Sequence, residues 1–94
     1  MARWEIVAWK DIPAAVEATD ERGQVTLQLS ERFQALIDSV AMQQGLEGSD
    51  AYLEQWRKLP GGERPGSAQE VGETVVAELE ARFMDYIGRA FRAP

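Results

Sequence analysis

The chain has 94 residues, a formal net charge of −6 and neither cysteine nor histidine. A chain of this length supports one hydrophobic core, so we expect a single domain over residues 1–94. Without thiol or imidazole groups, the sequence excludes disulfides, zinc sites built from these ligands, imidazole-based serine triads and cysteine nucleophiles. We predict no catalytic residue, metal site or cofactor, and an enzyme using only carboxylate or lysine chemistry stays an open alternative.

Charge and hydropathy restrict the partners and the location of the chain. Its ten lysines and arginines are scattered along the sequence, whereas a nucleic-acid binder concentrates basic residues in one stripe. No segment approaches the ~20 apolar residues that a membrane helix needs, and the first residues lack the apolar run of a signal peptide. We therefore expect a cytoplasmic protein that binds neither nucleic acid nor membrane.

Three segments near the start of the chain show the patterns of β-strands. The first two, over residues 3–10 and 13–20, are joined by the connection "KDIP". The turn residues "DERG", in which Gly23 is free to adopt positive φ, lead into a third strand over 24–29. These short connections predict a three-stranded antiparallel meander.

A first helix is predicted over residues 31–44. Ser30 is a favourable N-cap, Glu31 complements the positive end of the helix, and Gly45 ends the segment. The apolar residues recur at intervals of three and four on one face, namely Phe33, Leu36, Ile37, Val40 and Ala41. We expect this face to cover one side of the sheet.

Two more helices are predicted over residues 50–59 and 68–91, so the fold class is α+β. The shorter one presents aromatic and apolar residues at helical spacing, and "PGGERPG" is interpreted as the linker that follows it. The longer one begins with a capping box formed by Ser67 and Glu70 and carries one continuous apolar stripe.

The first strand carries a large aromatic residue on each side, which needs an explanation. Alternation places Trp4 with Ile6 on one face, and Glu5 and Val7 with Trp9 on the other. In one interpretation the C-terminal helix, or the loop before it, covers the second face and both tryptophans are core residues. In the other, Trp9 lies in a patch that faces a partner, since aromatic residues are enriched at interface hot spots.

A candidate binding site follows from the charges beside these aromatic residues. If helix 50–59 docks next to the end of the first strand, an aromatic pair is ringed by basic side chains suited to an anion or to a partner's carboxylate. The alternative is that the aromatic rings are buried and the charges are solvated at the rim. The predicted partner- or ligand-binding residues are Trp9, Lys10, Asp11, Trp56 and Arg57.

The stretches "RWEIVAWKDIPAAV" and "LSERFQALIDSVAMQQGLEGSDAYLEQWRK" resemble the small bacterial "virulence factor" domain, which is also found at the C-terminal end of conserved virulence factor C. The likeness runs from Arg3 to Lys58 and departs from the family in lacking a basic run between the second and third strands. It rests on Trp9 to Pro13, Glu31 to Phe33, Ile37 and Asp38, Ala41 and Met42, Gly45 and Leu46, Asp50 to Leu53, and Trp56 and Arg57. The resemblance carries over no catalytic residue.

Two hypotheses about function follow. The first is a non-catalytic protein-interaction module or accessory subunit of a larger bacterial assembly. The resemblance implies a link to folate and corrinoid methyl transfer, with a one-carbon metabolism enzyme as the partner. The second is a binding domain for a small anionic ligand, a folate or phosphate compound, held by Lys10, Arg57 and Arg64. Self-association through an uncovered apolar face is a separate open question.

Overall fold

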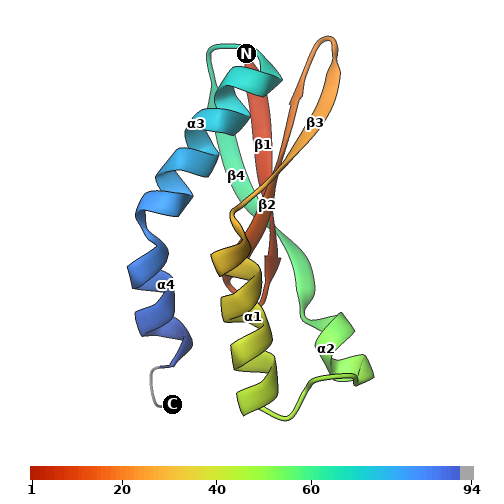
Figure 1. The fold of residues 1–94 in the computed structure, drawn as a ribbon. Helices are drawn as coiled ribbons and strands as arrows, with labels where there is room; N and C mark the ends of the chain where they lie inside the picture. Colours follow the sequence, from red (N-terminus) through yellow and green to blue (C-terminus); the bar gives the residue numbers. More distant parts are fainter. Residues whose placement is uncertain (92–94) are drawn as a thin grey trace.

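The computed structural model describes residues 1–91, and an antiparallel meander forms its first third (Figure 1). The strands β1 (Ala2–Trp9), β2 (Ile12–Asp20) and β3 (Gly23–Gln28) pair as neighbours in chain order. Gly23 has φ of 144° and pairs with Asp20 to close the second hairpin. The predicted meander is therefore confirmed.

A further strand, β4 (Trp56–Arg64), pairs antiparallel with β1 and gives the sheet order β3-β2-β1-β4. The sheet therefore has four strands and not the predicted three. The helix predicted over 50–59 begins where expected but is shorter, because α2 (Asp50–Glu54) ends before Trp56. The four-residue spacing of Tyr52 and Trp56 suggested one helix. In the structure Tyr52 lies on α2 and Trp56 on β4, and the two rings meet at the same corner of the fold.

The predicted linker is also largely part of β4. Pro60 lacks an N–H donor but fits here because β4 is an edge strand, where one side of the backbone needs no partner. Gly61 and Gly62 lie against the backbone and ring of Trp4, where any Cβ at Gly61 would collide with both. Gly61 is thus required by close approach, Gly62 lies in tight contact with the ring of Trp4, and neither marks a flexible connection.

The helix α1 (Glu31–Gln43) confirms the predicted first helix. Gly45 has φ of 69°, and the N–H of Leu46 donates to the carbonyl of Ala41 over 2.8 Å, as in a Schellman motif. Ser30 is the N-cap, but its side chain bonds Glu80 of another helix instead of the first turn of α1. The N-terminal end of α1 is therefore fixed by a tertiary contact.

The predicted helix over 68–91 is divided into α3 (Ala68–Ala81) and α4 (Phe83–Ala90). The capping box of Ser67 and Glu70 is confirmed at the start of α3. At the break, Arg32 of α1 donates to the backbone carbonyl of Glu80 over 2.7 Å. The turn brings Phe83 to 4.9 Å from the ring of Phe33 and so lets α4 pack on α1. The apolar pattern of the sequence, being continuous, gives no sign of this break.

The core lies between the sheet and the helices. Gly72 of α3 lies against Leu27 and Ala18, and Ala18 is the register partner of Trp4, so α3 covers the Trp4 side of the sheet. The side of Glu5 is polar: Glu5 is exposed, and Lys58 pairs with the neighbouring carboxylate of Glu17 over 2.9 Å. Buried side chains of both α1 and α3 belong to one cluster with those of β1 and β2.

None of the helices within residues 1–91 combines the length and the apolar character that a membrane-crossing helix needs.

Candidate functional site

Four of the five predicted site residues meet at the end of β1. Trp9 pairs with Ile12 across the tight turn to β2 and with Trp56 across the ladder to β4. Arg57 follows on β4, and its Nε donates to the carbonyl of Lys10 over 2.8 Å. The two tryptophans Trp9 and Trp56 therefore lie side by side, but through strand pairing and not through docking of a helix over 50–59, on which the sequence-based hypothesis depended.

Trp9 is fully buried. Its relative exposure is 0%, and its indole Nε1 donates to the backbone carbonyl of Tyr52 over 2.8 Å. The rings of Trp9 and Tyr52 lie 5.5 Å apart. This burial favours the core interpretation for Trp9, with one correction: α2, and not the C-terminal helix, covers it.

Lys10 has a backbone conformation that is uncommon for a residue with a side chain, with φ of 55°. Its N–H donates to the carbonyl of Gln55 over 2.9 Å, and its carbonyl accepts the bond from Arg57. Its ammonium donates to Gln44 and lies 5.4 Å from the ring centre of Trp9. The backbone contacts hold the turn in place, and the ammonium group of Lys10 is engaged by side chains of its own domain.

The remaining charges do not join this corner. Asp11 is exposed at the turn. Lys58 points to the polar side of the sheet, where the hydrogen bond to Glu17 raises its pKa. Trp56 is half-buried, with its ring edge-on to Tyr52 at 6.4 Å. The hypothesised arrangement, an aromatic pair ringed by basic side chains that are free to bind an anion, is therefore not formed.

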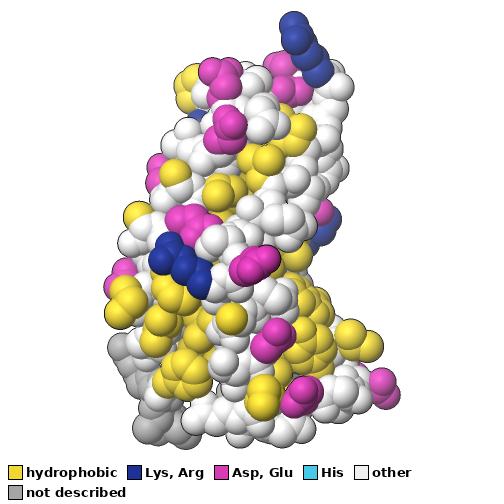
Figure 2. Space-filling model, in the orientation of Figure 1, with side chains coloured by type: hydrophobic (Ala, Val, Ile, Leu, Met, Phe, Trp, Pro, Cys, Tyr) yellow, Lys and Arg dark blue, Asp and Glu magenta, His cyan; other side chains and the backbone are white. Residues whose placement is uncertain are grey.

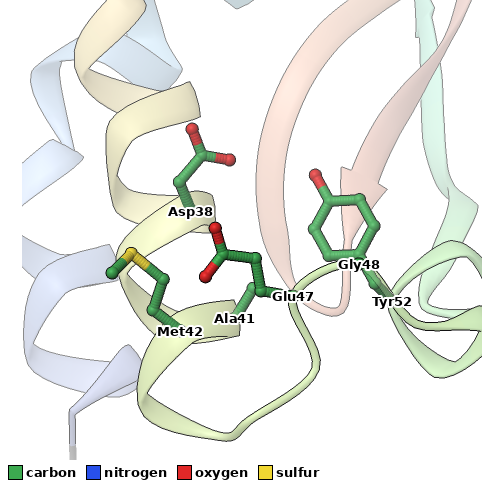
Figure 3. Close-up of a pocket in the computed structure, with 6 residues that line it drawn as sticks. All are labelled: Asp38, Ala41, Met42, Glu47, Gly48 and Tyr52. Atoms are coloured by element: carbon green, nitrogen blue, oxygen red, sulfur yellow. The ribbon is translucent and has the colours of Figure 1, made fainter.

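A cleft of about 410 Å³ opens beside this corner, between α1 and α2 (Figure 3). Tyr52, whose backbone carbonyl accepts the hydrogen bond from Trp9, stands on one side of the cleft, and α1 forms the other (Figure 3). The lining residues are Asp38, Ala41 and Met42 from α1, Glu47 and Gly48 from the connecting loop, and Tyr52 from α2. Ala41 is buried, whereas Met42 is 62% exposed.

Both charged residues of this α1–α2 cleft are acidic. The carboxylate of Glu47 lies between Met42 and Tyr52, and that of Asp38 lines the cleft from α1 (Figure 3). The Nε2 of Gln34 donates to one oxygen of Asp38 over 3.0 Å. None of the ion pairs within residues 1–91 includes Asp38 or Glu47. The space-filling view shows apolar surface bounded by acidic side chains in this lower part of the molecule (Figure 2).

Sequence reasoning missed this cleft. None of its six lining residues is among those predicted from the sequence to bind a partner or ligand. A usable signal was present, because Gly45 ends one helix and Ser49 caps the next only four residues later, which places two helix ends side by side.

The comparisons with known proteins agree with the resemblance described above. Neither the curated proteins nor the solved structures yield a match to the chain. Residues 7–86 match the family described as "Virulence factor". The match includes α3, which lay outside the likeness recognised in the sequence, and it extends over most of the domain. The chain therefore belongs to the Virulence factor family.

Proposed function

We propose that this domain is a non-catalytic protein-interaction module, an accessory subunit of a larger assembly, and that the α1–α2 cleft is its docking surface. The observation that carries the proposal is an apolar recess of about 410 Å³ beside Met42, which is 62% exposed. Burying exposed apolar surface of this kind is the main favourable term in protein association.

The proposal changes the role of the residues that were expected to bind a partner. Trp9 is interior, so its contribution is to position Tyr52, which forms the wall of the cleft. Lys10 and Arg57 fix the turn below α2 through the carbonyl of Gln55 and through each other. A rigid wall lowers the ordering cost of binding, because less flexibility is lost when the partner docks.

The identity of the partner stays a prediction based on the family resemblance. An enzyme of folate- or corrinoid-dependent one-carbon metabolism in the bacterial cytoplasm is the expected partner. The proposed docking at the α1–α2 cleft does not depend on this identity. It needs only a partner with a segment that fills the cleft.

Several contacts weigh against the alternative of a small anionic ligand. Lys10 and Arg57 are engaged with Gln44 and with the turn. Both terminal nitrogens of Arg64 bond the carboxylate of Glu78 at 2.8 Å. The six residues that line the cleft carry negative charge and no positive charge.

The test is affinity capture with the tagged full chain in cells where its gene is native. The variants are Met42→Glu in the cleft and Met84→Glu on α4, the latter a matched control because Met84 is 74% exposed and lies outside the cleft. We expect a stoichiometric partner with the wild type and with Met84→Glu, and its loss with Met42→Glu. Equal recovery with both variants, or no partner with the wild type, would refute the proposal.

A further inference from the structure

The chemistry of the α1–α2 cleft indicates what kind of segment fits it, an inference that rests on the proposed function. We infer that the cleft takes a segment of a partner protein in which an apolar anchor side chain is flanked by lysine or arginine. Two independent features of the cleft lead to this inference: its apolar floor, and two carboxylates that form no ion pair within residues 1–91.

The floor and walls of the cleft suit an apolar side chain. Ala41 is buried at the base, the ring of Tyr52 forms one wall, and Gly48 adds no side chain that would narrow the space. Met42 borders the cleft with a flexible, polarizable side chain, which adapts to the shape of an inserted group. A volume of about 410 Å³ falls within the range of about 300–1,000 Å³ that is typical of binding pockets.

The two carboxylates of the cleft favour a cationic partner. Asp38 and Glu47 reach the cleft from different elements, and neither has an ion-pair partner within residues 1–91. When an apolar anchor closes the cleft, both carboxylates lose water, and desolvating a carboxylate is costly unless a cation replaces the water. A segment with lysine or arginine beside its anchor supplies that cation, whereas a neutral or acidic segment does not.

A second copy of this chain is a poorer occupant than a basic partner. Each copy carries a net charge of −6, so two copies repel one another as they approach. Charge complementarity therefore favours a different, basic protein.

Site-specific crosslinking tests the inference directly. The photoreactive residue p-benzoylphenylalanine replaces Met42 in the full chain in cells, and a control chain carries it in place of Met84. We expect crosslinks from position 42 to a partner segment with lysine or arginine within about one helical turn of an apolar residue. A segment with acidic or uncharged flanks, or a crosslinked second copy, overturns the inference and leaves the interaction module standing. If position 42 gives no more crosslinked product than position 84, both the inference and the proposed interaction module are refuted.

Charge reversal then tests the role of the carboxylates, with the crosslinked segment made as a labelled peptide. Glu47→Lys is compared with Glu63→Lys, which makes the same change at an exposed position at the far end of β4. We expect Glu47→Lys to weaken binding about tenfold and to reduce its salt dependence, and Glu63→Lys to leave both unchanged. Equal or tighter binding by Glu47→Lys overturns the inference.

Discussion

The indole nitrogen of Trp9 and the backbone carbonyl of Tyr52 are joined by a 2.8 Å hydrogen bond between residues 43 positions apart. This bond connects the buried end of β1 with the wall of the α1–α2 cleft. A change inside the core at Trp9 is therefore expected to alter a surface that Trp9 itself does not reach.

Trp9→Phe is predicted to destabilise the fold and to loosen α2. Phenylalanine keeps an aromatic ring but removes the donor, so the carbonyl of Tyr52 loses its partner and a small cavity remains. We expect a loss of at least about 2 kcal/mol in the free energy of unfolding. Urea denaturation measures this loss. An unchanged midpoint would mean that the bond does not hold α2.

Gly61→Ala is predicted to destabilise the sheet. A Cβ at position 61 collides with the backbone and ring of Trp4, so β4 must move away from β1. Overpacking of this kind costs about 1–3 kcal/mol. Gly88→Ala on α4 is the matched control, because a Cβ there meets open space. The control is expected to gain about 0.5–1 kcal/mol from helix propensity, and equal midpoints for the two variants would contradict the close approach at Gly61.

Protonation of the Glu80 carboxylate is predicted to lower the free energy of unfolding in acid. Burial alone would raise the pKa of Glu80, but hydrogen bonds from Ser30 and Arg32 outweigh it and hold the pKa below its ordinary value of 4.5. A carboxylate with a lowered pKa in the folded state stabilises fully above the unfolded value and progressively less as the pH falls through the folded value. The contact between α1 and α3 therefore weakens below about pH 4.5.

Glu80→Gln isolates this contribution. Glutamine keeps the shape of the side chain but has no titrating charge, so the variant should be less stable at pH 7 and should lose less stability between pH 5 and pH 3. The test is to measure the free energy of unfolding of the wild type and of Glu80→Gln across that pH range. Parallel pH profiles would show that Glu80 does not carry the acid sensitivity.

Lys10 gives a prediction about backbone strain. Its φ of 55° suits glycine and is costly for β-branched residues. Lys10→Gly is expected to leave stability within about 1 kcal/mol of the wild type, because relief of strain offsets the lost contacts of the ammonium. Lys10→Val is expected to cost about 1–3 kcal/mol. Thermal or urea unfolding ranks the variants, and the reverse order would exclude a left-handed conformation at this turn.

The elements that the sequence predicted correctly are those fixed by local chemistry. Gly23 closes a hairpin, Gly45 ends α1, and Ser67 with Glu70 starts α3, each within a few residues of the signal. β4 could not be predicted in this way, because Pro60 and Gly61 are tolerated only through their place on an edge strand beside Trp4.

The candidate site was predicted only in part for the same reason. The sequence made the adjacency of Trp9 and Trp56 depend on docking of a helix over 50–59, whereas it arises from the pairing of β1 with β4, and the burial of Trp9 depends on where α2 docks. The break between α3 and α4 likewise depends on Arg32, which reaches the carbonyl of Glu80 from another helix. Such long-range contacts leave no mark in the local sequence.

The central claim is that Trp9 is an interior residue that fixes the wall of the cleft, and hydrogen exchange of the three tryptophan indole N–H groups tests it most directly. NMR of the nitrogen-labelled chain resolves these groups. The indole of Trp9 is predicted to exchange most slowly, at a rate set by unfolding of the domain, while that of the half-buried Trp56 exchanges faster. Exchange of the Trp9 indole at the rate of Trp56 or faster would contradict the account.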